Sequence, residues 1–420
     1  MKTVVVIGQG YVGLPVAMRS VVAGHNVIGI ESSPQRLSKL RSGISFVEDI
    51  SSAELAAALT SSRYLPSADY SDAAGFDVAV ITVPTPLRDS APDLSYIEAA
   101  AASLAPFVSR GATVILESTT YPGTTEELMA PILERGSSLK AGVDFFVGYS
   151  PERIDPGNEK WNLQNTPKVI SGMNGASLDA VSDFYSSIID TVVPVRGCRE
   201  AELAKLIENT FRHVNIALMN ELAVFAHELD IDLWDAIDAA SSKPFGYMRF
   251  TPGPGVGGHC LPIDPSYLSW RVRQTLNRQF RFVELANDVN DHMPQYVVQR
   301  LTLALNRRCL SVRGSRVLML GLAYKPNSSD ARESPAVRVA QLLIDLGADL
   351  RVVDSHIVEL PTALSEITLT EVTEEELESA DAVLVVTDHD DVDYDLVHKH
   401  AAYVLDTRRR VPSGAAVEYL

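Results

Sequence analysis

A single thiol lies in the most unusual stretch of this chain. The segment TPGPGVGGHCLPIDP, residues 251–265, holds four glycines and four prolines around Cys260. Buried structural cysteines usually lie in apolar strands or helices, so packing alone does not explain this one. Gly257 and Gly258, just before the thiol, allow a ligand to approach the backbone closely. We expect Cys260 to act as a nucleophile, the alternative being a loop cysteine without a chemical role.

The residues after the thiol are typical of a helix start. In DPSYLSW, Asp264 stands near the expected cap and Pro265 in the first turn. Backbone N–H groups and the helix dipole at such an end favour a thiolate and a developing oxyanion. No second ligand pair stands at a suitable spacing from His259 and Cys260, so we expect no metal there.

A second chemical feature lies near residue 10, in VVVIGQGYVGLPVA. Gly8, Gly10 and Gly13 follow an expected strand and open an expected helix, an arrangement that binds a dinucleotide pyrophosphate. Glu31 ends the next expected strand, where a carboxylate accepts the ribose 2′-hydroxyl and repels a 2′-phosphate. The pattern favours NAD over NADP, the alternative being a glycine turn without a cofactor. Neighbouring candidates are Tyr11, Val12 and Arg36, the last of which is also explained as a solvated helix residue.

The elements that position these residues alternate between short apolar runs and helical patterns. Strands buried on both faces of a parallel sheet are expected at residues 3–8, 26–31, 78–83, 113–118, 144–150 and 168–172. One helical stretch without Pro or Gly follows at 198–241, more helix at 265–310, and renewed strand–helix alternation from about 315. We expect an α/β fold with two Rossmann-like, doubly wound parallel-sheet domains joined by a long central helix. The expected domains are 1–197 for the cofactor, 198–312 for the helices and thiol loop, and 313–420 for the second α/β unit.

Composition narrows the class of protein. The 420 residues carry a formal charge of −18, so we expect no nucleic-acid partner, and an anionic ligand requires a local basic pocket. No apolar run approaches the roughly 18 residues that span a bilayer, and no signal peptide precedes the first strand. Cys198, Cys260 and Cys309 are too few and too scattered for a disulfide framework. We expect a cytoplasmic protein with free thiols and no membrane partner.

Four separated motifs resemble those of the UDP-glucose/GDP-mannose dehydrogenase family, whose members are NAD-dependent nucleotide-sugar 6-dehydrogenases. They are IGQGYVGLPVA, AELAKLIENTFRHVNIALMNELA, PGPGVGGHCLPIDP and GLAYKPNSSDARESPA, in order over essentially the whole chain. Within the family, YSPERIDPGN, SKPFGYM and GGHC are most similar to the bacterial UDP-N-acetylglucosamine 6-dehydrogenase branch.

The resemblance implies that a sugar C6 hydroxymethyl is oxidised to a carboxylate by two hydride transfers to NAD. Cys260 matches the family nucleophile, which captures the aldehyde as a thiohemiacetal and, after the second oxidation, carries a thioester. A free thiol has a pKa near 8.5, so the site must lower it.

The resemblance also implies roles for five further residues. Lys205 and Asn209 stand four apart on one helix face and match groups that stabilise the C6 oxyanion. Asp264 and Thr119 match residues that hold a water, although the alignment also allows Thr120 in place of Thr119. Glu152 matches the general base of thioester hydrolysis.

Binding residues follow from the same resemblance. Lys325 matches a sugar-binding lysine, Arg332 an arginine that reaches NAD, and Arg408 a late arginine of the family. Together they supply the positive field that a diphosphate needs on an acidic chain. The remaining candidates are Thr85 and Thr119 at the cofactor, and Glu152, Arg153, Lys205, Asn209, Gly255, Gly257 and Gly258 at the substrate.

The chain departs from the family pattern at three places. Pro156 replaces a second loop glutamate, and Ile263 stands where relatives have a lysine. Pro244 replaces an arginine that reaches the partner subunit's sugar site, and Lys243 and Arg249 are the nearby cations. We therefore assign no role that needs the missing groups.

Three classes of function stay open at this stage. The first is a nucleotide-sugar 6-dehydrogenase acting on a UDP- or TDP-sugar, with UDP-N-acetylglucosamine favoured over UDP-glucose and TDP-glucose. The others are a two-electron hydroxyacid dehydrogenase, which needs no cysteine, and a nucleotide-binding protein without turnover. We expect a homodimer formed through the long central helix.

Overall fold

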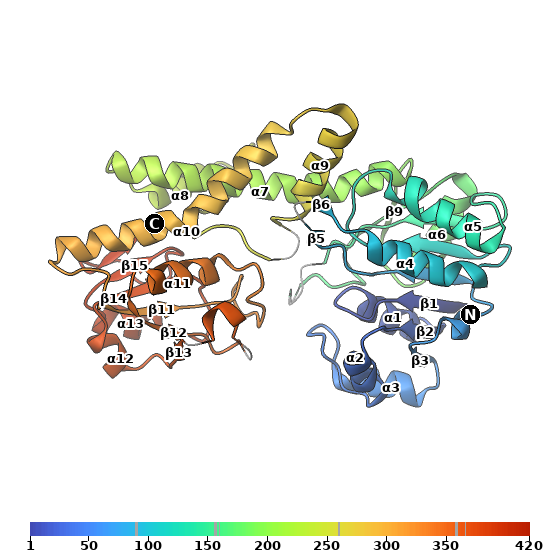
Figure 1. Ribbon diagram of the computed structural model, residues 1–420, viewed down its shortest axis with the longest axis horizontal. Coiled ribbons are helices and arrows are strands. Elements are labelled where there is room, and N and C mark those ends of the chain that lie inside the picture. Colours follow the sequence, from blue (N-terminus) through green and yellow to red (C-terminus); the bar gives the residue numbers. More distant parts are fainter. Residues whose placement is uncertain (89–90, 155–157, 159, 259–260, 358–359, 366) are drawn as a thin grey trace. The chain divides into compact units, whose positions relative to one another are not determined.

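Each of two units in this chain is built around its own parallel-type sheet (Figure 1). The computed structural model describes residues 1–88, 91–154, 158, 160–258, 261–357, 360–365 and 367–420. Unit 1 comprises Met1–Glu208 with Ser266–Leu276, and unit 2 comprises Asn209–Pro265 with Asn277–Leu420. Cys260, His259 and Pro156 lie outside the described residues.

The sheet of unit 1 has eight strands in the order β10-β9-β8-β7-β4-β1-β2-β3. Their bounds are β1 (Thr3–Ile7), β2 (Asn26–Ile30), β3 (Tyr64–Ser67), β4 (Val78–Ile81), β7 (Thr113–Leu116), β8 (Phe146–Tyr149), β9 (Lys168–Gly172) and β10 (Val192–Pro194). Neighbours pair in parallel except β8 and β9, which are antiparallel. A short antiparallel pair, β5 (Leu87–Arg88) and β6 (Ala91–Pro92), stands apart from this sheet.

Helices cover both faces of this sheet, which explains its uninterrupted apolar strands. In β1, Val5 and Ile7 join one buried cluster, whereas Val4 and Val6 join another. The first cluster includes α4 (Ser95–Leu104) and α5 (Ala130–Ser137). The second includes α1 (Gly13–Val22), α2 (Pro34–Arg41), α3 (Ser52–Thr60) and α6 (Gly175–Tyr185).

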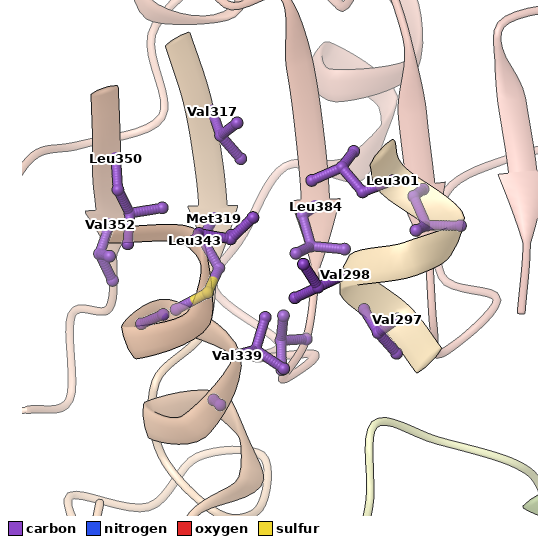
Figure 2. Close-up of a cluster of buried hydrophobic side chains, with 14 of the residues drawn as sticks. Val297, Val298, Leu301, Val317, Met319, Val339, Leu343, Leu350, Val352 and Leu384 are labelled. Carbon is purple, nitrogen blue, oxygen red and sulfur yellow. The ribbon is translucent and has the colours of Figure 1, made fainter. Parts of the chain in front are cut away.

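The sheet of unit 2 has the order β13-β12-β11-β14-β15-β16, and all of its pairs are parallel. The bounds are β11 (Arg316–Leu320), β12 (Asp349–Val353), β13 (Thr368–Leu369), β14 (Ala382–Val385), β15 (Val404–Asp406) and β16 (Val417–Tyr419). Figure 2 shows side chains of α10 (Arg281–Arg307) and α11 (Pro335–Asp345) meeting one face of this sheet. The other face packs against α12 (Glu374–Ser379) and α13 (Tyr394–His400).

The helical stretch expected at 198–241 is two helices rather than one. α7 (Cys198–Glu228) ends where Asp230 adopts a positive φ of 57°, and α8 (Leu233–Ser241) begins after Asp232. The Asp232 carboxylate accepts hydrogen bonds from the backbone N–H groups of Trp234 and Asp235, which caps the new helix. The helix α9 (Asp264–Leu276) follows the thiol loop.

The fold class predicted from the sequence is confirmed. In the described part of the chain six strands were not predicted: β3, β10, β13 and β16 are edge strands of at most four residues, of which β3 and β10 contain proline, and β5 and β6 form the separate two-residue pair. The edge strand β16 has three residues of only intermediate burial. The three-domain division remains a prediction. Among the described residues, no helix combines the length and apolar character needed to cross a membrane.

Candidate active site

The three glycines after β1 have three different surroundings. A Cβ on Gly8, whose φ is 91°, would lie 2.9 Å from the Thr82 carbonyl oxygen. A Cβ on Gly13 would lie 1.8 Å from the Gly8 carbonyl oxygen, so only glycine lets α1 approach β1. A Cβ on Gly10 would meet nothing within 4 Å. The protein itself does not need a glycine at position 10, which fits a place kept clear for a pyrophosphate.

The carboxylate expected at the ribose is held by backbone groups. Glu31 is 5% exposed, and its two oxygens accept hydrogen bonds from Gln9 N at 3.2 Å and Ser33 N at 2.8 Å. A carboxylate accepts about four hydrogen bonds, so these contacts orient Glu31 and still leave room for a hydroxyl. Arg36 is exposed on α2, with its guanidinium 5.6 Å from the Phe46 ring centroid. Tyr11 is exposed, and Val12 is the N-cap residue of α1.

The loop that follows β7, residues 117–125, is called the threonine loop below. It is hydrogen-bonded to the loop after β4 and to α7. Thr85 donates its hydroxyl to the Thr119 carbonyl oxygen at 2.7 Å. Thr120 is fully buried and donates to Thr124, whereas Thr119 is only half-buried. These surroundings favour Thr119 over Thr120 as the residue that meets a ligand.

The loop after β8 carries Glu152 and Arg153. Glu152 Oε1 accepts hydrogen bonds from the backbone N–H groups of Arg153 and Ile154, both at 2.6 Å, and Oε2 binds Lys168 Nζ at 2.9 Å. The Arg153 guanidinium is paired with Glu208 Oε1 at 2.7 Å and donates to the Pro167 carbonyl oxygen at 2.8 Å. Arg153, predicted at the substrate, thus has protein partners for its guanidinium.

The helix α7 is hydrogen-bonded to a residue that follows the thiol in the sequence. The Asn209 amide nitrogen donates to Asp264 Oδ2, and both side chains are buried, at 6% and 2% exposed. Lys205 lies one turn earlier on α7 and is half-buried. Asp264 is the first residue of α9, four positions after Cys260. The structure therefore brings two of the predicted catalytic residues together, although the thiol lies outside the described part of the chain.

The glycines of the thiol loop pack against the protein itself. A Cβ on Gly257 would lie 2.7 Å from Pro335 Cδ, and a Cβ on Gly258 would lie 2.8 Å from the Tyr324 ring. Gly255 has a φ of 128°, and a Cβ on it would lie 3.1 Å from Pro335 Cβ and 3.1 Å from the Asn290 carbonyl oxygen. We predicted that these glycines admit substrate and cofactor; in the structure, close packing on residues 324–335 already requires them.

The three predicted cations lie around this loop in unit 2. Arg408 donates from Nε to the Val386 carbonyl oxygen at 2.8 Å, and its Nη1 lies 2.7 Å from a Cβ built on Gly253. Arg332 binds Asp330 through two hydrogen bonds of 2.8 Å. The Lys325 ammonium lies 5.9 Å from the Tyr324 ring centroid. Burial lowers the pKa of Arg408, against the nearby carboxylates of Asp388 and Asp406.

A cavity of about 880 Å³ opens beside the loop, entirely within unit 2. Its lining combines the loop with α10 and the segment before α11, and includes Val256, Pro262, Asn290, Arg332, Pro335 and Arg338. The charged lining is mixed, because the carboxylates of Asp291, Asp330 and Glu333 accompany the two arginines, and such a polar hollow suits a hydroxyl-rich ligand.

The position of the missing family arginine is exposed. Pro244 lies in the exposed segment after α8, where Lys243 stands over the Phe245 ring at 4.9 Å. Arg249 pairs with Asp238. Ile263 is half-buried beside Asp264.

Sequence reasoning missed four residues that hold the site together. Lys168 binds both Glu152 and Glu117. The Glu202 carboxylate on α7 accepts a hydrogen bond from Gly123 N in the threonine loop. Asn220 accepts from Gly253 N at 2.8 Å and so fixes the start of the thiol loop. A lysine opening an apolar strand and a glutamate ending one were the available signals for the first two.

Comparison with known proteins identifies the family. The family model for the UDP-glucose/GDP-mannose dehydrogenase NAD binding domain matches residues 2–189, the central domain 199–292 and the UDP binding domain 318–412. The chain is 34% identical to a UDP-N-acetyl-D-mannosamine dehydrogenase of Pyrococcus horikoshii, covering 92% of this chain and 89% of that protein. It is 37% identical to a UDP-N-acetyl-D-glucosamine 6-dehydrogenase of Pseudomonas aeruginosa, over 84% of this chain and 82% of that protein.

A solved structure shows the same architecture. A UDP-D-ManNAc dehydrogenase from Pyrococcus horikoshii superimposes with a TM-score of 0.89 at 32% identity, covering 99% of this chain and 98% of that chain. The three matching domain models and these relatives together show that the chain is an NAD-dependent oxidoreductase acting on a CH–OH donor, a member of the UDP-glucose/GDP-mannose dehydrogenase family.

Proposed function

We propose that this enzyme oxidises the C6 hydroxymethyl of a nucleotide sugar to a carboxylate in two steps, with Cys260 as the covalent nucleophile. The hydrogen bond between Asn209 and Asp264 carries the proposal. It fixes α7, with Lys205 on the same face, to the residue four positions after the thiol. A two-electron hydroxyacid dehydrogenase needs no such thiol, and a protein without turnover needs no buried hydrogen bond between α7 and Asp264.

The described residues divide the chemistry among them. NAD+, when bound, accepts one hydride in each oxidation. Lys205 and the second N–H of the Asn209 amide stabilise the negative charge on the C6 oxygen. Asp264 and Thr119 orient water, and Glu152 accepts its proton as the thioester is hydrolysed. Lys325 binds the sugar and Arg332 reaches NAD+, and together with Arg408 they supply the positive field that a diphosphate needs.

For the substrate we propose UDP-N-acetylglucosamine. The segment SKPFGYM and the 37% identical Pseudomonas aeruginosa relative support it. UDP-N-acetylmannosamine is the second candidate, because relatives at 34% and 33% identity are named for that sugar. The two sugars share the acetamido group and differ in configuration at C2. UDP-glucose and TDP-glucose lack this group and rank lower.

The test counts NADH released per sugar, with each of these four nucleotide sugars limiting and NAD+ in excess. We expect two NADH per UDP-N-acetylglucosamine and a Cys260→Ala variant without net acid production. Two NADH only from UDP-N-acetylmannosamine would keep the mechanism and change the substrate. One NADH per sugar would contradict the role of Cys260, and none from any sugar would contradict the proposed function.

We further propose that the enzyme is a homodimer through α7. Large apolar side chains recur along one side of this helix at spacings of seven, four and three residues, and 39–51% of each is exposed: Phe211, Leu218, Leu222 and Phe225. Such a stripe is typical of a helix that packs against a partner.

A further inference from the structure

A buried ionic cluster lies behind Glu152 in unit 1. Lys168 Nζ binds Glu152 Oε2 at 2.9 Å and also binds Glu117 Oε1. The Tyr185 hydroxyl donates to Glu117 Oε2. The side chains of Lys168 and Glu117 are 3% and 0% exposed, whereas that of Glu152 is 16% exposed. Glu152 is thus the member of the cluster that water can reach.

The topology of the sheet brings these charges to one edge. Glu117 follows β7 and Glu152 follows β8, both at the carboxyl ends of their strands. Lys168 is the first residue of β9, which runs antiparallel to β8, so its ammonium arrives at the same edge. This reversal is the one antiparallel pairing in the described part of the eight-stranded sheet.

The contacts fix Glu152 but leave it able to take a proton. The described contacts use about three of its four acceptor positions, two on Oε1 and one on Oε2. Burial raises the pKa of Glu152, but the Lys168 ammonium more than offsets this, and with the hydrogen bonds lowers it to about 2. Burial raises the pKa of Glu117 to about 7, against the same ammonium.

We propose that Lys168 is a positioning residue for thioester hydrolysis, holding Glu152 as an oriented carboxylate while Glu117 keeps the ammonium paired throughout the step. The proposal rests on the proposed function. In the step, the water oxygen bonds to the acyl carbon, the C–S bond breaks, the Cys260 sulfur leaves as thiolate, and the water proton goes to Glu152 Oε2. At that moment Glu152 loses its charge. A buried ammonium without an anion is strongly unfavourable, and Glu117 supplies that anion.

The arrangement also separates this role from the hydride steps. Within the described part of the chain, Lys168 contacts Glu117, Glu152 and the Tyr185 ring, and not Lys205 or Asn209, which act on the C6 oxygen. A change at Lys168 should therefore slow hydrolysis and leave both oxidations nearly unaffected. A purely structural ion pair would instead affect all steps together through loss of folded enzyme.

The test uses Lys168→Met/Glu117→Gln in the full-length protein. The double variant removes the Lys168 cation together with the Glu117 anion, so the charge of the cluster that remains is that of Glu152, whose side chain is 16% exposed and keeps its backbone N–H donors. Lys140→Met, at an exposed lysine outside the cluster, is the control. Thermal unfolding first establishes that the variants are folded. Rapid-quench single turnovers with UDP-N-acetylglucosamine then measure NADH formation and free acid separately, and intact-mass spectrometry measures the acyl adduct on the protein.

We expect both hydride rates within about threefold of wild type and hydrolysis slowed at least about tenfold, with the acyl adduct accumulating on the protein.

The groups that face Glu152 are Lys168 from β9, Glu117 from the end of β7, Tyr185 of α6 behind Glu117, and the loop N–H groups. In the double variant the Lys168 ammonium no longer stabilises the ionised form of Glu152, so the pKa of Glu152 rises. The pH at which the hydrolysis rate falls on the acidic side should therefore be higher in the double variant than in wild type.

The inference is overturned if the folded double variant hydrolyses the adduct at the wild-type rate, or if all steps slow equally. Wild-type enzyme that releases two NADH establishes the proposed function in the same experiment, so these outcomes concern Lys168 alone. Wild-type enzyme that releases fewer than two NADH from each of the four nucleotide sugars would overturn the proposed function and, with it, this inference.

Discussion

The contact between Asn209 and Asp264 is the smallest unit on which the proposed chemistry depends. An amide and a carboxylate are complementary, because one supplies N–H donors and the other accepts them. Both side chains are almost fully buried, so water cannot replace a lost partner.

Asn209→Asp is nearly isosteric and replaces the donor by a second acceptor. We expect the free energy of unfolding to fall by about 1–3 kcal/mol and kcat to drop sharply, since two buried carboxylates face each other. The loss should be smaller at pH 5.5 than at pH 8, because a shared proton restores a hydrogen bond at low pH. Urea unfolding and NADH formation at both pH values measure this, with Asn215→Asp on the same helix as control. Equal loss at both pH values would contradict the account.

The glycine pair after β1 makes a second test at this scale. Gly10→Ala meets nothing within 4 Å, so the melting temperature should stay unchanged while NAD+ binding weakens at least about tenfold. Gly13→Ala places a Cβ 1.8 Å from the Gly8 carbonyl oxygen and should destabilise the unit by about 1–3 kcal/mol or more. Calorimetric titration with NAD+ and thermal unfolding compare the two. Unaltered NAD+ affinity in Gly10→Ala would show that the cofactor does not approach there.

At the scale of elements, α7 is joined to the threonine loop through Glu202. This fully buried carboxylate accepts from Gly123 N at 2.6 Å, Thr125 N at 2.9 Å and the Thr125 hydroxyl at 2.7 Å. Glu202 lies one turn before Lys205, so the same contact sets both the loop of Thr119 and the start of the catalytic helix face.

Glu202→Gln replaces one carboxylate oxygen by an amide NH2, which then faces the N–H and O–H donors of the threonine loop. We expect the free energy of unfolding to fall by about 1–3 kcal/mol at pH 5. Burial raises the pKa of Glu202 to about 7, although its hydrogen bonds lower it. The folded state therefore binds the proton more tightly than the unfolded chain, and the wild type loses stability as pH rises from about 4.5 through 7. The variant has no such titrating group at this position, so its free energy of unfolding does not fall in this way. The difference in free energy of unfolding between wild type and variant should therefore be smaller at pH 8 than at pH 5. Urea unfolding at pH 5 and pH 8 measures this difference. A difference that is larger at pH 8 would contradict the raised pKa of Glu202.

Elements with a strong local pattern could be predicted from the sequence, and those decided by tertiary contacts could not. The apolar strands and the glycine turn after β1 were predictable, since burial on both faces and backbone geometry leave direct traces in residue type. The break in the helical stretch at Asp230 and the reversal of β9 leave weak local traces. Within the site, Lys205, Asn209 and Asp264 were found through motifs. Lys168 and Glu117 were not, because their significance lies in a contact between residues 51 positions apart.

At the scale of the whole molecule, the exposed stripe on α7 predicts how copies of the chain associate. Leu222→Glu/Phe225→Glu should convert a dimer into monomers, because two charges cannot be buried in an apolar helix interface without partners. Sedimentation velocity measures the mass in solution. Leu346→Glu, at an apolar residue 43% exposed on unit 2, should leave the mass unchanged. A wild type that sediments as a monomer, or a variant that still dimerises, would contradict the prediction.

The close packing of Gly255, Gly257 and Gly258 on Tyr324 and Pro335 constrains any attempt to redesign this enzyme. A thiol loop grafted from a relative with different sugar specificity would arrive without the surface against which it was shaped. Residues 251–265 and 322–336 are some 70 residues apart in sequence. Because they pack on each other, we expect that they must be exchanged together. Chimeras that carry residues 251–265 together with 322–336 should retain solubility and turnover where the loop alone fails.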